Sequence, residues 1–526
     1  MKLRRAVQLI FLLLFALLIA LTTFPLKISL PVDLFLLMDP LLIAGASLVT
    51  RAIVDGFLVA VLVLAATALL GRFFCGWVCP LGTTIELADE ALYRRRKRRW
   101  PNHQRVARGL KYVNLIVILV AAAFGYGLTF LLDPIALLTR TATYLLHPLV
   151  VLATNGGLDA VRPAADKAGW LGLYYARLHQ PLLSSGSLMA AAIFVAIIML
   201  NRLQRRFWCR SLCPLGGLLG LFARLSPAQR RVAEKCDHDG KCRRACETGA
   251  IDEDDLNYDP AECIMCWRCV DNCHLCVNTF GFTNPRPRLA QPLDVGRRRF
   301  LAGVAGGAFG AMLFRGSPSR LVRPDTLLRP PGARPESAFR QRCIRCGQCV
   351  KACPTNTLQP DWFDAGLEGI WAPVHHMRLA ACEQDCNVCG QVCPTGAIRA
   401  LGIDEKRYAK LGTAVLDTTR CLTYAQDKSC LVCNEACPYH AIAFWQVTGR
   451  HNRRPLVDWT RCNGCGMCES VCPVEGRGAI IVKPDGQIRL AEGSYIAEAK
   501  RRGYRFEHGT AEDQYGGTSP EGGAPR

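Results

Sequence analysis

Long apolar runs without charged residues alternate with polar segments in the first part of the chain. They cover Ala6–Phe24, Gly56–Gly71, Tyr112–Leu132 and Pro181–Asn201. The hydrocarbon core of a bilayer is about 30 Å thick, and a helix needs about 20 residues to cross it. We therefore predict a membrane α-helical bundle of four spans, of which the second is short and continues to Phe74.

A further uncharged stretch, Thr141–Leu158, does not fit this scheme. Pro148 and the sequence Asn155-Gly156-Gly157 are expected to interrupt a helix there. We interpret the stretch as a surface or re-entrant segment rather than as a span.

The net charge of the 526-residue chain is +21, from 64 Lys and Arg against 43 Asp and Glu. Such an excess is typical of nucleic-acid binding, but here the basic residues gather beside the apolar runs. Membrane proteins keep such short basic segments on the cytoplasmic side. The distribution favours four spans with both ends inside, and it disfavours a nucleic-acid partner. The basic groups are Lys2, Arg4 and Arg5, then Arg94–Arg99, then Arg202, Arg205 and Arg206.

The membrane part repeats itself. The sequence Phe35–Pro40 returns as Phe130–Pro134, and Phe73–Gly82 returns as Phe207–Gly216. Each half holds two spans, so the two halves share one orientation and form a parallel duplication.

Cysteine accounts for 28 residues, too many for an ordinary cytosolic enzyme, and the length excludes a small disulfide scaffold. Four groups end in Cys-Pro, and two of them have the C-x2-C-x2-C-x3-C-P spacing of bacterial 4Fe-4S ferredoxins. Three thiolates of one loop wrap a cluster, and the fourth usually reaches the neighbouring cluster. Zinc is the alternative for an isolated C-x-x-C, but not for four successive motifs. The groups are Cys343, Cys346, Cys349 and Cys353; Cys382, Cys386, Cys389 and Cys393; Cys421, Cys430, Cys433 and Cys437; and Cys462, Cys465, Cys468 and Cys472.

An irregular cysteine group precedes these motifs. Its second half keeps the regular spacing, although His274 replaces the usual proline, and in its first half Asp239 stands where the second cysteine is expected. Two hypotheses stay open. Asp239 is a weak, exchangeable ligand of a cluster that can lose one iron, or it is an exposed loop residue and Cys276 supplies the missing ligand. The other cysteines of the group are Cys236, Cys242, Cys246, Cys263, Cys266, Cys269 and Cys273.

Each half of the membrane duplication carries a cysteine pair, Cys75 with Cys79 and Cys209 with Cys213. The members of each pair are one helical turn apart and share a face. The two pairs could together bind one more cluster at the inner membrane surface. Structural thiols that cap the spans are the alternative.

Gly296–Leu301 reads Gly-Arg-Arg-Arg-Phe-Leu and leads into the apolar stretch Phe300–Phe314. This is the pattern of a twin-arginine export signal, a route that carries folded cargo. A linker with incidental arginines is the alternative. The signal predicts a fifth, outward span that stays attached, with Cys343 onward in the periplasm and Cys236–Cys276 in the cytoplasm.

These features divide the chain into five parts. Residues 1–225 are expected to form the four-span membrane domain, 226–285 a cytoplasmic dicluster ferredoxin-like domain of α+β class, and 286–340 the internal signal and a Pro/Arg-rich linker. Residues 341–485 would form a periplasmic four-cluster ferredoxin domain and 486–526 a C-terminal tail. We expect about six 4Fe-4S clusters, or seven with the membrane cysteines. Covalent haem is not expected, since no C-x-x-C is followed by His.

The chain resembles two known families in tandem. Residues 1–280 resemble the NapH type of membrane quinol dehydrogenase subunit, in the four spans, the two C-x-x-x-C-P motifs and the Asp133-Pro134 sequence. They depart from it at Asp239, Glu247 and His274. Residues 291–485 resemble the NapG (MauM) type of exported ferredoxin, in the twin-arginine sequence, Arg329–Ala333 and all four cysteine motifs. The resemblance implies a fusion of two partners.

The resemblance also implies electron transfer at the bacterial inner membrane, from quinol of the quinone pool to a periplasmic acceptor. That acceptor would be a cytochrome or a reductase such as a nitrate-reductase-type system. Asp133, His147 and His179 are candidate proton acceptors, but no catalytic residue is assigned. Asp39 and Asp133 fit more simply as helix N-caps before proline.

A second class of function is assembly or regulation of a respiratory metalloenzyme by an iron–sulfur membrane factor. Four successive exported motifs suit electron flow better than sensing. A reductase with its own terminal substrate site lacks support, since the chain has no flavin or molybdopterin signature and no Gly-rich phosphate loop. Whether the protein counts as an enzyme is therefore left open.

Overall fold

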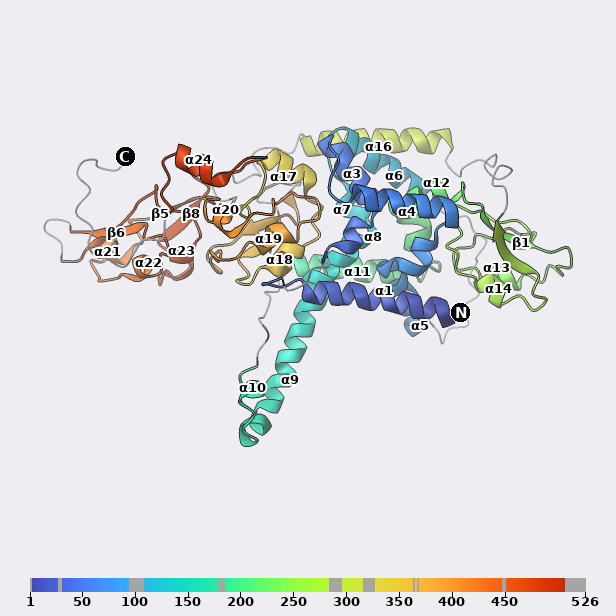
Figure 1. Cartoon of the computed structure of the whole chain (residues 1–526), viewed down its shortest axis with the longest axis horizontal. Coiled ribbons are helices and arrows are strands. Elements are labelled where there is room, and N and C mark those ends of the chain that lie inside the picture. The colour runs from blue at the N-terminus through green and yellow to red at the C-terminus, as the bar shows by residue number, and fades with distance from the viewer. Residues whose placement is uncertain are drawn as a thin grey trace.

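The computed structural model arranges the chain as three modules along one axis (Figure 1). A helical module (residues 2–225) lies between a middle module (226–282) and a C-terminal module (327–506). Helix α1 (Lys2–Leu21) spans this arrangement: Arg4 near its start lies 3.5 Å from Glu247 of the middle module. Just beyond its end, the Thr22 carbonyl accepts a hydrogen bond from Lys351 of the C-terminal module at 2.8 Å. The structure describes residues 2–26, 31–93, 108–176, 178, 185–282, 296–315, 327–362, 365–366, 369–446 and 451–506.

Helices occupy each of the four predicted spans, but most of them are short. By length and composition, two described helical stretches could cross a membrane, Lys2–Leu21 and Pro134–Lys167. Helices α4 (Phe57–Leu70), α6 (Leu110–Ala123) and α11 (Ser185–Leu200) have 14, 14 and 16 residues. At 1.5 Å per residue they cover roughly 21 to 24 Å. Helix length alone therefore does not establish a four-span bundle.

The duplication is visible in the helix starts. Helices α3 (Pro40–Thr50) and α8 (Pro134–Thr141) both begin at an Asp-Pro sequence. The Asp39 carboxylate accepts hydrogen bonds from two backbone N–H groups of α3 at 2.8 and 3.2 Å, and Asp133 does the same for α8 at 2.9 and 2.8 Å. The predicted N-cap role of both aspartates is confirmed. Helices α5 (Pro80–Tyr93) and α12 (Pro214–Ala223) each begin at the proline of a Cys-Pro sequence.

Short helical elements complete the helical module. The π-helical turns η1 and η3 contain the first cysteine of each C-x-x-x-C-P motif, and η2 joins α8 to α9. The basic run Arg94–Arg99 and His179 lie outside the described residues. The remaining elements are α2 (Leu34–Leu37), η1 (Phe74–Val78), α7 (Thr129–Leu132), η2 (Ala142–Leu146) and η3 (Trp208–Leu212).

The stretch Thr141–Leu158 is helical throughout, so the predicted interruption is wrong. Helix α9 (His147–Lys167) follows directly on the π-helical turn η2 (Ala142–Leu146), has Pro148 in its first turn and runs through Asn155. The Asn155 side chain is buried and exchanges two 2.9 Å hydrogen bonds with the Leu178 backbone, so it does not compete with the helix. Helices α9 and α10 (Leu171–Tyr174) form an arm that leaves the module crosswise to α1 (Figure 1).

The middle and C-terminal modules are built from two-stranded antiparallel ribbons and short helices, as the α+β expectation required. In the middle module β1 (Ala228–Val232) pairs with β2 (Asn278–Phe282) beside α13 (Lys241–Ala245) and α14 (Arg268–Asp271). The C-terminal ribbons are β3–β4 (Leu358–Pro360, Pro373–His375), β5–β8 (Thr413–Leu416, Ile480–Lys483) and β6–β7 (Ile442–Trp445, Arg454–Val457). Its helices are α17 (Glu336–Arg342), α18 (Gln348–Ala352), α19 (Val388–Gln391), α20 (Ile403–Arg407), α21 (Leu422–Ala425), α22 (Val432–Glu435), α23 (Met467–Ser470) and α24 (Tyr495–Arg501).

The C-terminal module is longer than predicted at both ends. Leu328 and Phe339, which were assigned to the linker 286–340, are buried in its core. Residues 486–506, assigned to the tail, also belong to it: Tyr495, Ala499 and Phe506 are buried in one apolar cluster with cysteines of the last motif. Both segments were assigned as linker and tail from their polar and glycine-rich composition, which does not reveal a few buried apolar residues.

Helix α16 (Arg297–Arg315), the predicted fifth span, packs lengthwise against α6. Glycines make the approach close: a Cβ atom at Gly303 would lie 3.1 Å from Ile116, and one at Gly307 would lie 2.8 Å from Val120. The two helices run in the same direction, because successive glycines of α16 meet successive residues of α6. Small residues allow this kind of close helix packing without polar contacts.

Buried charges join the helical module to the middle module. The Glu86 carboxylate pairs with Arg4 at 2.5 Å, with Arg268 at 2.7 Å and also with Arg206. Glu247 pairs with Arg206 at 2.7 Å and with Arg268 at 2.6 Å. Both carboxylates are almost fully buried. Arg4 and Arg206 of the helical module therefore pair with Glu247 of the middle module, and Arg268 of the middle module pairs with Glu86 of the helical module.

Replacement of Glu86 by Gln is expected to lower the free energy of unfolding by about 3–5 kcal/mol, because it leaves buried guanidinium groups short of a partner. Chemical denaturation in detergent measures this change. The matched control is Glu90→Gln, since Glu90 is more exposed and its pair with Arg5 lies near the surface. An equal effect of both substitutions would contradict the proposed importance of the buried network.

Candidate iron–sulfur sites

The cysteines of the C-terminal module gather into four sets of four. Three sets line pockets, and the fourth is identified by the mutual electrostatic interaction of its thiols. In each set, three cysteines come from one motif and one comes from the neighbouring motif, as expected for dicluster ferredoxins. The sets are Cys343, Cys346, Cys349 and Cys393; Cys353, Cys382, Cys386 and Cys389; Cys421, Cys430, Cys433 and Cys472; and Cys437, Cys462, Cys465 and Cys468.

The surroundings of these sets fit a 4Fe-4S cluster. Apolar side chains such as Ile344, Ile398 and Ile442 line the pockets beside the sulfur atoms. Burial raises the pKa of Cys346 and of Cys465 to about 12, so these thiols stay protonated unless a metal replaces the proton. Four thiolates around an apolar pocket match the known ligands of such clusters.

The four membrane-module cysteines also converge. Cys213 interacts electrostatically with Cys75, Cys79 and Cys209, so the two C-x-x-x-C-P motifs face each other. The Gly216 backbone N–H donates to the Cys213 sulfur at 3.2 Å, as it would to a thiolate ligand at the start of α12. The duplication thus brings both pairs to one place, as the shared-site hypothesis requires.

The first membrane motif touches the middle module at its cysteine loop. A Cβ atom at Gly76, between Cys75 and Cys79, would overlap the Ile264 carbonyl oxygen, so only glycine permits this approach. The Trp77 indole N–H donates to the Met265 carbonyl at 2.9 Å, and its ring meets Trp267 edge to face at 5.1 Å. The loops of two candidate clusters are therefore in direct contact.

The middle module contains one complete set. Cys246 interacts electrostatically with Cys263, Cys266 and Cys269, which follows the exchange seen in the C-terminal module. Cys242 interacts electrostatically with Cys236. These are the two cysteines of the first half-motif that do not belong to the complete set. Cys273 and Cys276 are the further cysteines of this module, and Cys276 is exposed.

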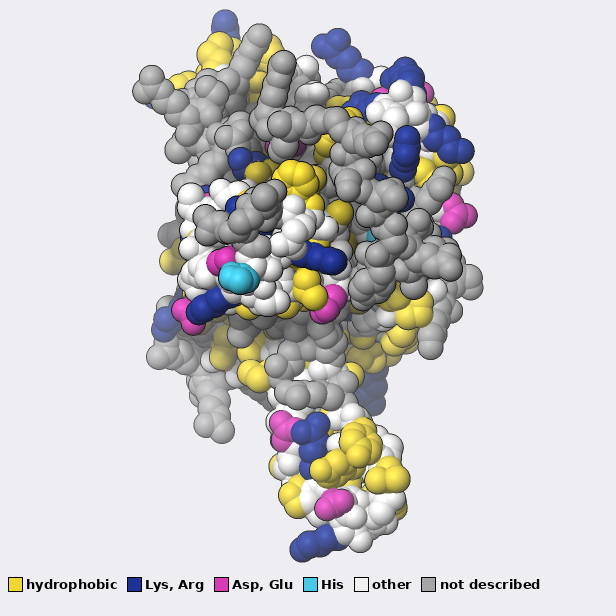
Figure 2. All heavy atoms as spheres, turned by 90° about the vertical axis from the view of Figure 1, so that its left-hand side faces the viewer, with side chains coloured by type: hydrophobic (Ala, Val, Ile, Leu, Met, Phe, Trp, Pro, Cys, Tyr) yellow, Lys and Arg dark blue, Asp and Glu magenta, His cyan; other side chains and the backbone are white. Residues whose placement is uncertain are grey.

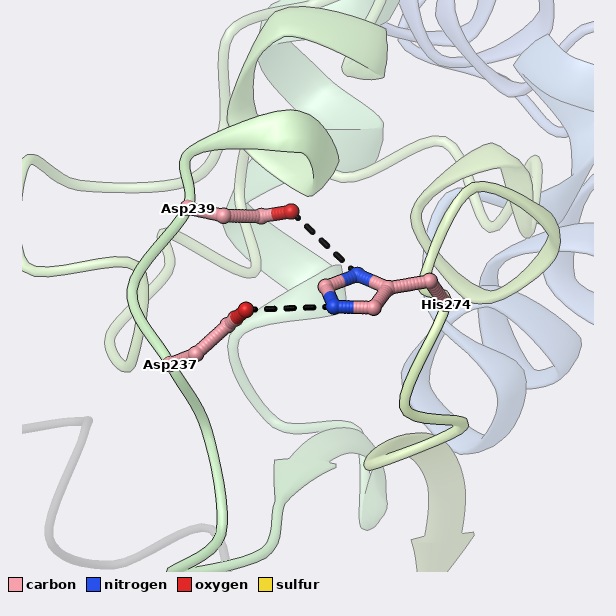
Figure 3. Close-up of side chains that lie close together, drawn as sticks. All are labelled: Asp237, Asp239 and His274. Carbon is pink, nitrogen blue, oxygen red and sulfur yellow. Dashed lines mark ion pairs between the residues drawn. The ribbon is translucent and has the colours of Figure 1, made fainter.

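Asp239 is engaged by other side chains. His274 lies between two carboxylates, with Nδ1 3.3 Å from Asp239 and Nε2 3.1 Å from Asp237 (Figure 3). Lys241 pairs with the Asp239 carboxylate at 2.8 Å and donates its backbone N–H to it at 2.9 Å. Asp237, Asp239 and His274 could hold a cation between them, but the group is largely exposed. The Asp239 carboxylate is thus engaged by Lys241 and His274, and both hypotheses for the missing cluster ligand stay predictions.

The candidate proton acceptors are separated in the structure. Asp39 and Asp133 are fully buried beside each other at the duplicated helix starts. His147 lies apart from them, in electrostatic contact with Lys351 of the C-terminal module. Neither place is identified as a quinol site by its geometry.

The role of Glu247 could be predicted from the sequence only in part. Glu247 was noted only as a departure after Cys246, where proline is usual. In the structure it is buried and pairs with Arg206 and Arg268. A glutamate beside a cluster cysteine indicates an ion pair when basic residues follow an apolar run elsewhere in the chain. The sequence does not show which basic residue is the partner.

The substitutions Cys75→Ser and Cys209→Ser are each expected to remove about four iron atoms per chain, and the double variant no more than either one, because all four cysteines would hold one cluster. Iron and acid-labile sulfide analysis of anaerobically purified protein measures this loss. Ser211→Ala, inside the second motif, is the control. Unchanged iron in both cysteine variants would contradict a shared site.

The substitution Cys276→Ser is expected to change the EPR signal of one cluster in the middle module, whereas Asp239→Ala leaves it unchanged. The reason is that Asp239 is occupied by Lys241 and His274. A changed signal in Asp239→Ala with an unchanged one in Cys276→Ser would reverse the assignment.

Comparison with known proteins agrees with these sites. A 4Fe-4S binding domain matches residues 53–101 and 185–232, around the two membrane motifs, and a 4Fe-4S dicluster domain matches residues 342–397 and 428–475. No solved structure matches the chain.

Among curated relatives, the ferredoxin-type protein NapG of Escherichia coli is 40% identical over 219 residues, which cover 39% of this chain and 91% of the relative. The methylamine utilization ferredoxin-type protein MauM of Methylobacillus flagellatus is 36% identical, over 36% of this chain and 80% of the relative. The putative electron transport protein YccM of Escherichia coli is 30% identical, over 46% of this chain and 60% of the relative. The protein therefore binds multiple 4Fe-4S clusters and belongs to the NapG and MauM family of ferredoxin-type electron-transfer proteins.

Proposed function

We propose that the protein carries electrons from membrane quinol to an acceptor in the bacterial periplasm. One observation carries the proposal: a single apolar core joins the cysteine sites of all three modules. It includes Cys75, Cys79 and Cys213 of the helical module and Cys346 of the C-terminal module, and Cys266 of the middle module packs against it. Candidate redox sites therefore lie at both ends of the helical module, with one continuous apolar core between them.

The long axis of the molecule is proposed to cross the inner membrane. Buried basic residues concentrate at the end of the helical module that contacts the middle module, where Arg4, Lys111 and Arg206 pair with its glutamates. The positive-inside rule places this end in the cytoplasm. The C-terminal module, bound at the opposite end, would then be periplasmic. In this orientation α1, α4, α6 and α11 are the four spans, as in NapH-type subunits.

Helix α16 fits the same orientation. It runs parallel to α6, with Arg297–Arg299 at its start and the C-terminal module after its end. A twin-arginine signal that stays attached would leave the chain in this arrangement. Its 19 residues would form a fifth span packed against the bundle rather than an isolated anchor.

The α9–α10 arm is proposed to lie on the outer membrane surface. It leaves the bundle crosswise to the spans, and Figure 2 shows apolar side chains exposed on it. Leu152, Trp170, Leu171 and Tyr175 are exposed there. Aromatic and apolar side chains on a helix in the plane of the membrane are typical of the lipid interface.

The cysteine sites would supply the redox chemistry, since a 4Fe-4S cluster takes up and releases single electrons. The residues of the chain hold the cysteines, exclude water from them and fix the contacts between modules. The relatives are named for ferredoxin-type proteins and methylamine utilization, so the acceptor is proposed to be a periplasmic cytochrome or reductase, for example a nitrate-reductase-type system. A terminal substrate site is not part of the proposal.

Quinol is expected to reduce the C-terminal clusters of the purified protein in lipid vesicles. Visible absorbance and EPR under anaerobic conditions follow this reduction. In Cys75→Ser the rate should fall at least about tenfold, since the helical site lies between the modules, while Ser211→Ala retains it. Clusters that are present but never respond to quinol would contradict the proposed flow.

β-Lactamase folds without disulfide bonds and protects cells only from the periplasm; fused after Phe506 it is expected to be active in conferring ampicillin resistance, whereas the same reporter placed after Phe282 is inactive. The twin-arginine substitution Arg297→Lys with Arg298→Lys should abolish activity of the C-terminal fusion. An active reporter after Phe282 would overturn the topology.

A further inference from the structure

The first cysteine loop of the C-terminal module docks on the helical module at the π-helical turn η2. The Thr143 hydroxyl donates to the Cys346 carbonyl at 3.4 Å, and the Arg140 guanidinium donates to the Arg345 carbonyl at 3.1 Å. Gln348 of the same loop donates to the Val32 carbonyl at 3.2 Å. Two chain segments about 200 residues apart are thus held together around one candidate cluster.

Tyr144 inserts its ring tip into this loop. The side chain is 4% exposed, and a Cβ atom at Gly347 would lie 2.8 Å from its Cζ and 2.9 Å from its hydroxyl. Gly347 has φ +83°, so the loop needs glycine there both for its conformation and for the tyrosine. The π-helical turn, a feature often found at functional sites, places the ring at this position.

The Tyr144 hydroxyl has no hydrogen-bond partner among the described residues. A buried hydroxyl without a partner costs about 1–3 kcal/mol, so an acceptor is expected nearby. Cys349, Cys346 and Cys343 interact electrostatically with it, with Cys349 the strongest of the three. These cysteines, with Cys393 and Gly347, line the pocket described above, so the Tyr144 hydroxyl lies against the loop that forms the wall of that pocket.

We propose that Tyr144 donates a hydrogen bond to the cluster held by Cys343, Cys346, Cys349 and Cys393, and thereby raises its reduction potential when the modules are docked. The inference rests on the proposed function, since it requires this cluster. A hydrogen bond to a cluster sulfur or to a thiolate ligand stabilises the reduced form, which carries one more negative charge. Tyr144 is a positioning and tuning residue, not a catalytic one.

Two buried cations act in the same direction. The Arg345 guanidinium stacks 3.6 Å from the Phe130 ring centroid, and the Arg140 guanidinium lies 4.0 Å from that of Trp371. Arg140 interacts electrostatically with Cys346, and Arg345 with Cys343. Of these groups, Arg140 and Tyr144 belong to the helical module. The reduction potential of this cluster is therefore highest when the two modules are in contact. A higher reduction potential favours the transfer of electrons to the cluster across this junction.

The test is an EPR-monitored redox titration of the full chain carrying Tyr144→Phe. Removal of one hydrogen bond to a charged group is expected to lower the reduced-to-oxidised ratio of one cluster, at fixed potential, by about tenfold. Pulsed EPR in deuterated buffer should show an exchangeable proton coupled to that cluster in the wild type and not in the variant. Tyr126→Phe, in the same apolar cluster of side chains, is the control and should change neither signal.

Unchanged potentials and an unchanged proton coupling in Tyr144→Phe, with full iron content, would overturn this inference alone. Loss of the cluster signal in Cys346→Ser identifies which signal belongs to the site. A wild-type protein with no signal assignable to Cys346 would instead refute the proposed cluster. The pulsed measurement on the wild type tests the hydrogen bond even when a variant folds poorly, because absence of an exchangeable proton there also overturns it.

Discussion

The junction between the helical and middle modules depends on charges buried away from water. A carboxylate or guanidinium in such a place is strongly destabilising unless its partners are present. Glu86 contacts arginines from three separate segments of the chain, and Glu247 shares all three of them. These groups are satisfied only together, so the two modules are expected to fold as one unit. This unit fixes how the cysteine loops of the two modules meet.

Glycine allows close contact at both ends of the helical module. Gly76 lets the first membrane motif meet the Ile264 carbonyl of the middle module, and Gly347 lets the C-terminal module meet Tyr144. In both cases a cysteine loop of one module touches backbone or side chain of another without an intervening layer. Close packing excludes water and holds redox sites at fixed separations, which suits a protein whose chemistry is electron transfer.

Much of the site could be predicted from the sequence, because cluster ligands are local in spacing. The regular motifs predicted which cysteines belong together, and Asp39 and Asp133 were recognisable as caps from the following proline. Long-range pairing could not be predicted. Nothing local marks Glu247 as the partner of Arg206, or Tyr144 as a neighbour of Cys349. The helical path through Asn155 was missed because its amide is satisfied by Leu178, a contact that only folding creates. Tyr495 and Phe506 were missed because isolated aromatic residues in a polar segment resemble a tail.

The core of the C-terminal module depends on aromatic residues that lie more than 30 positions after its last cysteine, Cys472. Tyr504 and Phe506 stack on each other, and both rings cover Lys410, which in turn donates to the Trp459 carbonyl and to the Cys462 carbonyl. The last cysteine loops therefore receive their apolar cover only after almost the whole described chain has been made. A truncated chain would carry every cysteine and still leave this core open. Under the proposed twin-arginine export, which carries folded cargo, a chain cut before Tyr504 would lack a packed C-terminal module to export.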